Sequence, residues 1–159
     1  MLVNPKTMSR AEINQSYESG RRDYRDLNLR QVDLSGLHLQ GVNFSATDLR
    51  EANLSQSDLC GSTLRYTNLK NANLSEAKLR HSNLTMAQLS QATLSCSDLY
   101  GSVLRGAYLN QASLRNAILQ SVDLSGAQLD GTDLTGASFD IYTIFPEEFK
   151  PIAAQMISL

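Results

Sequence analysis

Residues 52–56 read ANLSQ and residues 72–76 read ANLSE, and the leucine of each segment belongs to one unbroken series. From Tyr24 to Phe139 every fifth residue is large and apolar, which makes 24 positions, 21 of them leucine and three aromatic. Neither an α-helix nor an ordinary β-strand has a period of five. The chain is therefore predicted to form a solenoid of short repeats.

The residue two positions before each leucine is small. From Val42 to Ala137 these 20 positions hold ten Ala, five Ser, three Thr and two Val. Residues two apart on an extended segment point to the same side, so the small residue and the leucine are predicted to face inward. The two mostly polar residues after each leucine are predicted to turn the chain. One repeat is thus one side of a closed coil, and inward Ser and Thr hydroxyls are expected to bond to corner carbonyls.

The segments ANLSQ and ANLSE resemble the A(D/N)LXX unit of the pentapeptide-repeat family, and the resemblance extends over roughly residues 22–141. It implies an all-β fold, a right-handed quadrilateral parallel β-helix with four repeats per coil. The 24 repeats then make about six coils around a dry leucine interior that leaves no room for a ligand. The expected coils are 22–41, 42–61, 62–81, 82–101, 102–121 and 122–141.

The two flanks are expected to cover the open ends of this stack, because unpaired strand edges invite aggregation. Ser9 and Glu12 have the spacing of a capping box, and Gly20 can end a helix. Residues 1–21 are therefore expected to form an N-terminal cap with a helix over about 9–19.

At the other end, residues 142–159 are expected to form a C-terminal cap. The Pro- and Phe-bearing segment 141–151 resembles the tail that closes many cyanobacterial members of the family. Its apolar residues are expected to cover the sixth coil, followed by a short helical stub over residues 152–156.

The 159 residues and the net charge of −2 fit one domain. The first five residues lack the features of a signal peptide and no apolar run is long enough to span a membrane, so the expected location is the cytoplasm. Cys60 and Cys96 fall two coils apart on different sides, about 10 Å apart along the axis, and are expected to be free thiols.

Residues that carry chemistry are sparse. His38 and His81 have no cysteine or carboxylate cluster around them at metal-ligand spacing, and no glycine-rich phosphate loop occurs. Serines align on one corner of successive coils, but a filled solenoid offers no pocket for a substrate. The chain is predicted not to be an enzyme and to need no metal or cofactor.

Stacking at twenty residues per coil aligns the outward residues into columns. One corner column begins with three cations, Arg30, Arg50 and Lys70, and another alternates hydroxyl residues with Arg25, Arg65 and Arg105. Residues 117–159 carry a net −5 and residues 1–116 a net +3. This polarity either orients a partner or is only a solvated surface.

Apolar side chains at outward positions are the second surface signal, and with the basic column they make up a candidate protein-interaction surface. Scattered apolar residues are also ordinary on protein surfaces, so the alternative is that these side chains have no role in binding. The apolar and aromatic candidates are Tyr66, Met86, Tyr100, Val103, Tyr108 and Ile118.

Three classes of function remain open. The first is a protein-interaction scaffold or regulator with another protein as partner, itself a monomer or end-to-end dimer. The second is mimicry of DNA, known for family members that bind DNA gyrase and protect it from quinolones; a rod of ~29 Å would need roughly 17 negative charges, against a net −2. The third is a structural or ice-binding face. Direct binding to nucleic acid or to a membrane is not expected.

Overall fold

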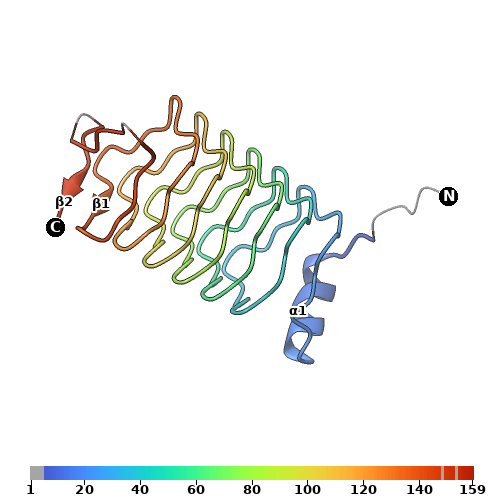
Figure 1. Cartoon of the computed structure of the whole chain (residues 1–159). Coiled ribbons are helices and arrows are strands. Elements are labelled where there is room, and N and C mark those ends of the chain that lie inside the picture. Colours follow the sequence, from blue (N-terminus) through green and yellow to red (C-terminus); the bar gives the residue numbers. More distant parts are fainter. Residues whose placement is uncertain (1–5, 148, 153) are drawn as a thin grey trace.

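The computed structural model describes residues 6–147, 149–152 and 154–159. The chain winds in stacked coils, with the helix α1 (Arg10–Glu18) at one end and the short strands β1 (Ser138–Phe139) and β2 (Ile157–Ser158) at the other (Figure 1). Each outward residue forms a parallel bridge with the residue twenty further on, from Asp23 with Asn43 to Ile118 with Ser138. Four five-residue repeats therefore complete one coil.

The backbone of each coil is hydrogen-bonded to the coils on both sides. The Asn73 N–H donates to the Ala52 carbonyl at 2.9 Å, and the Leu74 N–H donates to the Thr93 carbonyl at 2.7 Å. At each corner the chain makes a β-turn, as where the Ala77 N–H donates to the Leu74 carbonyl at 3.1 Å. The third residue of this turn has positive φ, even where it is not glycine, as for Glu76 at 58°.

The inward leucines form a continuous core, and those from Leu34 to Leu124 are fully buried. The prediction for the inward hydroxyls is confirmed at most positions: Thr47 donates to the Tyr24 carbonyl at 2.7 Å and Thr67 to the Phe44 carbonyl at 2.8 Å. Ser97 and Ser102 are exceptions, because their buried hydroxyls have no hydrogen-bond partner among the described residues.

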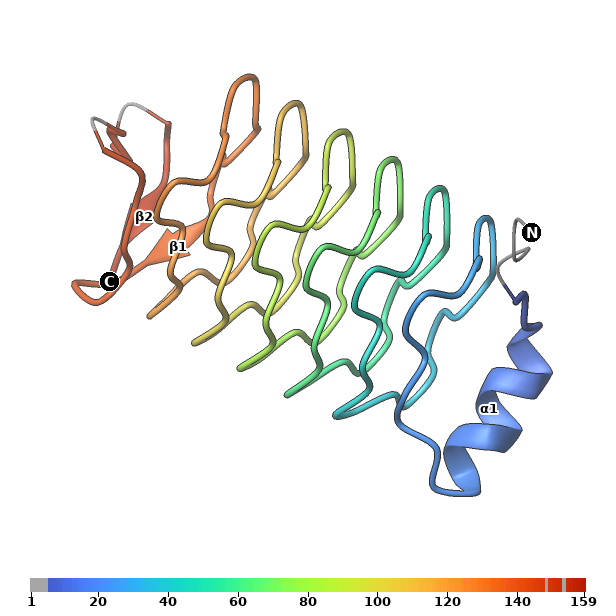
Figure 2. The ribbon, with the colours of Figure 1, turned by 45° about the vertical axis from the view of Figure 1, so that its right-hand side comes forward.

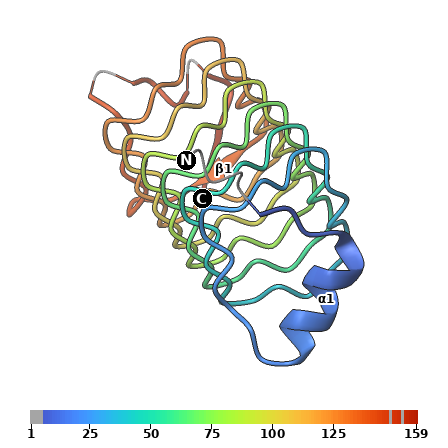
Figure 3. The same ribbon diagram turned by 90° about the vertical axis from the view of Figure 1, so that its right-hand side faces the viewer.

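Helix α1 lies against the first coil (Figures 2 and 3). Its N-cap is Ser9, whose hydroxyl accepts from the Glu12 N–H while the Glu12 carboxylate accepts from the Ser9 N–H at 2.7 Å. Ile13 is fully buried in the common core, and the Tyr17 hydroxyl donates to the Gln40 carbonyl at 3.1 Å.

The helical stub predicted over residues 152–156 is wrong. Its described residues form turns up to Gln155, and Ala153 lies outside the described residues. The chain then extends into β2, which pairs in parallel with β1. The Ile157 N–H donates to the Ala137 carbonyl at 2.8 Å, so this segment provides hydrogen-bond partners for the backbone of the last coil. A helix bonds its own backbone groups and would leave those of the coil unpaired.

Candidate functional site

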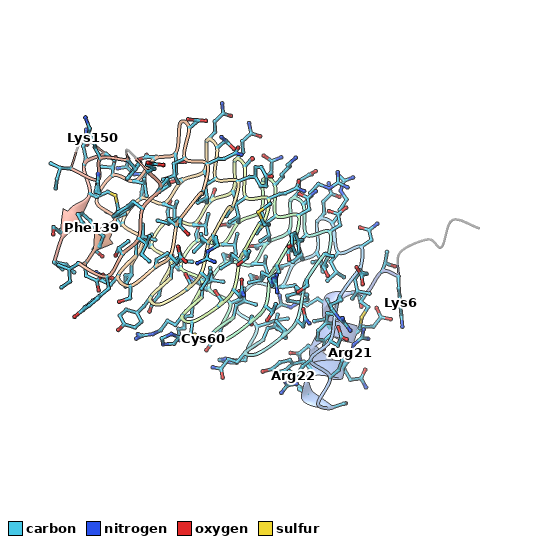
Figure 4. All side chains as sticks on the ribbon, viewed as in Figure 1. Lys6, Arg21, Arg22, Cys60, Phe139 and Lys150 are labelled. Carbon is cyan, nitrogen blue, oxygen red and sulfur yellow. The ribbon has the colours of Figure 1, made fainter. Side chains whose placement is uncertain are left out.

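The filled interior leaves only the outer surface for binding. The described part of the chain contains no group of three or more His, Cys, Asp or Glu side chains that could hold a metal ion. Among the same residues, no helix has the length and apolar character needed to cross a membrane. Side chains project outward all along the coils, with Lys6, Arg21 and Arg22 near the α1 end and Lys150 at the opposite end (Figure 4).

The structure brings two of the predicted apolar residues together. Tyr66 and Met86 stand twenty residues apart, on the same corner of consecutive coils, with 54% and 36% of their surfaces exposed. Met86 lies over Gly106, where a Cβ atom would stand 2.6 Å from the Met86 sulfur. The residue after Tyr66 in this column is Met86, whose side chain occupies the space over the next coil. Tyr66 therefore has no glycine to lie over and is more exposed than Met86.

Tyr100 lies at a different corner and is partly covered by its neighbours. Its ring meets the His81 ring edge-on, with centroids 5.6 Å apart, and the Arg80 guanidinium lies 4.8 Å from the centre of the Tyr100 ring. Arg80 also pairs with Asp98 at 3.5 Å.

The other three apolar candidates do not form one patch. Outward residues one repeat apart face successive sides of the coil, so Val103, Tyr108 and Ile118 lie in three different bridge ladders. Ile118, for example, is bridged to Asp98 and Ser138, whereas Val103 is bridged to Asn83 and Asp123. The corners of the fifth coil therefore carry these three candidates to different sides of the coil.

Tyr108 instead joins a residue of the basic column. Tyr108 and Lys70 line a surface hollow of about 290 Å³ together with Gln88 and Ser90. Stacking at twenty residues per coil places Lys70 and Ser90 in one corner column. It did not predict that the Tyr108 side chain, on the adjacent side of the coil, lies beside them.

The remaining cations of that column are paired within the protein. Arg30 bonds to Glu51 at 2.9 Å, and Arg50 bonds to Asp48 at 2.5 Å. The hydrogen bond from Arg50 lowers the pKa of Asp48, and bonds from Gln31 and then Arg30 lower the pKa of Glu51. Sequence reasoning aligned these arginines but missed their carboxylate partners.

A second surface hollow, of about 340 Å³, lies beside Tyr66 on the corner that carries the other arginine column. We call it the Arg65 hollow; its lining residues are Arg25, Asn43, Ser45, Thr63, Arg65 and Tyr66. Arg25 is paired with Asp23 at 2.7 Å, and its hydrogen bonds hold the pKa of Asp23 at about 2. Arg105, in the same column, is paired with Asp123 at 3.2 Å.

The chain belongs to the pentapeptide-repeat family: a family model described as pentapeptide repeats matches it in eight copies, over residues 28–65, 61–95 and 97–136. Together with the solved relatives, this match implies a right-handed quadrilateral β-helix. A search of curated proteins gives no match.

Several solved pentapeptide-repeat proteins are similar to this chain. Rfr23 from the cyanobacterium Cyanothece 51142 is 28% identical, with a TM-score of 0.56 over 84% of this chain and 97% of its own. HetL from Nostoc sp. strain PCC 7120, described as involved in the regulation of heterocyst differentiation, is 31% identical, with a TM-score of 0.44 over 84% and 67%. AT2G44920 from the Arabidopsis thaliana thylakoid lumen is 25% identical, with a TM-score of 0.47 over 78% and 70%.

Proposed function

We propose that this protein is a non-enzymatic interaction scaffold or regulator that binds another protein through the outer surface of its coils. The observation that carries the proposal is the exposed pair Tyr66 and Met86, which lies next to the Arg65 hollow. Leucine side chains fill the interior of the coils, so binding has to use this outer surface. Tyrosine, methionine and arginine are enriched in protein interfaces, and tyrosine and arginine among the residues that contribute most to binding.

The backbone that presents this surface is held from both sides. The Tyr66 N–H donates to the Thr85 carbonyl at 3.1 Å, and the Met86 N–H donates to the Arg105 carbonyl at 3.0 Å. A surface that is already ordered loses little conformational entropy when it binds, which favours binding by a rigid face.

The similarity to HetL supports the regulator class, and a cytoplasmic location is part of the proposal.

Mimicry of DNA is the weaker alternative. Among the described residues, six aspartates on the coils are paired with arginines of the same protein, which reduces the negative field that a DNA mimic requires. These aspartates are Asp23, Asp33, Asp48, Asp98, Asp123 and Asp133. The third reading, a regular ice-binding or structural face, lacks a flat uniform ladder, since the serine column contains Arg115.

The test is affinity capture from native lysate with the wild type and the double variant Tyr66→Ser, Met86→Ser. Ile118→Ser is the matched control, because Ile118 is 39% exposed but lies on another side of the coil. We expect a specific protein to be lost with the double variant and retained with the control. Equal capture by all three would contradict the proposed surface, and inhibition in a parallel gyrase supercoiling assay would favour DNA mimicry. Size-exclusion chromatography distinguishes a monomer from an end-to-end dimer.

A further inference from the structure

The arginines of the coils follow a pairing rule. Each one with a carboxylate partner finds it two residues earlier, eighteen residues later or twenty-one residues later, positions that the stacked coils bring beside its side chain. The pairs are Arg25 with Asp23, Arg30 with Glu51, Arg50 with Asp48, Arg80 with Asp98, Arg105 with Asp123 and Arg115 with Asp133.

Arg65 is the exception. The three positions that would supply its partner hold Thr63, Asn83 and Met86, none of which carries charge. Within the described residues its guanidinium makes neither an ion pair nor a hydrogen bond, and its one contact of note is with the Tyr66 ring, 5.6 Å away. The arginines at the N-terminal end of the stack do have acceptors: Arg10 donates to the Ser35 carbonyl, Arg21 to the Asp23 carbonyl and Arg22 to the Tyr17 carbonyl.

The polar groups around Arg65 offer further donors. The Asn43 side-chain oxygen accepts from the Ser45 N–H at 3.0 Å and from the Ser45 hydroxyl at 2.6 Å, which fixes the amide so that its NH₂ group is free to donate. Thr63, also in the lining of the Arg65 hollow, adds a hydroxyl with no partner among the described residues. The hollow therefore combines one unpaired cation with neutral donors.

We propose that the Arg65 hollow binds the carboxylate of an aspartate or glutamate on the partner protein, with Tyr66 and Met86 packing against an apolar residue next to it. This inference rests on the proposed function and names the chemistry of the partner. A guanidinium binds a carboxylate through two parallel hydrogen bonds. The second cation of the hollow, Arg25, is already bound to Asp23 through both carboxylate oxygens, so the site matches one negative charge.

The same count disfavours other anions. A phosphate group carries up to two charges and is usually met by more than one cation, and a nucleic acid strand needs a row of them. Arg105, the next arginine of the column, is neutralised by Asp123. A single acidic side chain beside an apolar one is the ligand that this arrangement fits.

The test uses the full-length protein and random dodecapeptides displayed on phage. We expect selection on the wild type to enrich peptides with Asp or Glu beside an aromatic or aliphatic residue. In fluorescence polarisation, Arg65→Gln should weaken a selected peptide about tenfold or more, as expected for loss of a bidentate charged pair. The matched control Arg105→Gln, in the same column but ion-paired, should change its affinity less than twofold.

A cycle with the peptide separates the carboxylate contact from other effects. Replacing the peptide's acidic residue by its amide should weaken peptide binding to the wild type by the same factor as Arg65→Gln does. In the Arg65→Gln variant the same replacement should leave the affinity unchanged. Equal binding by wild type and Arg65→Gln overturns the inference, as does the absence of any acidic peptide bound at millimolar concentration. Binding of inorganic phosphate by the wild type, without binding of any acidic peptide, overturns it in favour of a phosphate ligand.

The two proposals fail in different ways. If Tyr66→Ser abolishes peptide binding while Arg65→Gln leaves it unchanged, the interaction surface stands and the carboxylate site falls. If neither residue matters to peptides or to capture from lysate, both proposals fall.

Discussion

The imidazole ring of His81 occupies the space that a side chain on Gly101 would need. A Cβ atom at Gly101 would stand 2.6 Å from His81 Nδ1, well inside van der Waals contact. The two residues share one corner column, twenty residues apart, and both have positive φ. The Met86 sulfur likewise takes the space beside Gly106, so at both corners glycine in the next coil leaves room for the larger side chain.

Gly101→Ala is expected to destabilise the protein more than Gly61→Ala. Both glycines have φ near 65°, so alanine costs about 1–2 kcal/mol of backbone strain at either site. Only at Gly101 must a neighbouring side chain also move, because a Cβ at Gly61 meets nothing within 4 Å. Chemical denaturation of the two variants measures the difference in the free energy of unfolding.

The His81→Ala background is the control for this comparison. The extra cost of Gly101→Ala over Gly61→Ala should disappear there, because the displaced ring is gone. A difference that persists in that background would mean that His81 is not its cause.

Ser97→Ala is expected to leave the free energy of unfolding unchanged or to raise it, whereas Ser57→Ala lowers it by about 1 kcal/mol. Both hydroxyls are buried at equivalent positions, but Ser57 donates to the Leu54 carbonyl at 2.6 Å and Ser97 has no partner among the described residues. Thermal unfolding of the two variants tests this, and a loss at Ser97 equal to that at Ser57 would contradict it.

These serines mark the limit of what the sequence predicts. The fivefold period identified the inward leucines, such as Leu54 and Leu74, because burial of a large apolar residue at every repeat leaves one arrangement. The four repeats per coil that the family resemblance implied aligned Arg25, Arg65 and Arg105, because the register is uniform. It did not distinguish Ser57 from Ser97, since the difference lies in side-chain rotation and not in residue type.

Leu74→Ala in the middle of the stack is expected to lower the free energy of unfolding by about 2–5 kcal/mol, from lost burial and the cavity left behind. Leu74 is fully buried, with leucines stacked on both sides of it. Ile118→Ala, at an exposed position, should cost much less and serves as the control. Urea denaturation measures both, and equal losses would refute the packed leucine interior.

Asp133→Asn is expected to reduce the loss of stability on acidification. Hydrogen bonds from Thr135, and then from Arg115, lower the pKa of Asp133 from 3.8 to about 2. Because the folded-state pKa lies below the unfolded value, this carboxylate stabilises the fold above pH 3.8, and the contribution is lost as the pH falls toward 2. Asparagine keeps the oxygen that accepts from the Thr135 N–H at 3.0 Å but does not titrate.

The reciprocal variant is Asn73→Asp, in the same column, where Asn73 accepts from the Ser75 N–H at 3.0 Å. It should add acid sensitivity in the window that Asp133→Asn removes. Melting temperatures measured from pH 7 to pH 2 test the pair; parallel profiles for both variants and the wild type would contradict the assignment.

Deletion after Phe139 is expected to cause aggregation or end-to-end dimers. It removes β2, the buried Met156 and Phe145, whose ring lies 5.4 Å from that of Phe139. The last coil would then expose apolar surface and unpaired backbone. Size-exclusion chromatography with light scattering is the measurement, and an unchanged monomer would show that the tail is not a cap.

The surface was harder to predict than the interior. Tyr66 and Met86 were predicted as candidates without being paired, although the twenty-residue register puts them on one corner. Val103, Tyr108 and Ile118 were predicted with them but lie on different sides, because each repeat turns the corner to a new side. Arg25 and Arg50 pair with aspartates two residues earlier, but other ion pairs depend on side chains reaching between coils, as Arg105 does to Asp123. Pairs of this second kind follow from the twenty-residue register and not from neighbours in the sequence.

The twenty-residue register also constrains how the chain can change length. A duplication or loss of twenty residues would preserve every column, so that the molecule grows or shrinks by one layer with its outer pattern in phase. A gain of only five residues would keep the leucines inward yet rotate everything downstream by a quarter turn, carrying Asp123 away from Arg105. For this architecture, the interior tolerates insertions that the outside does not.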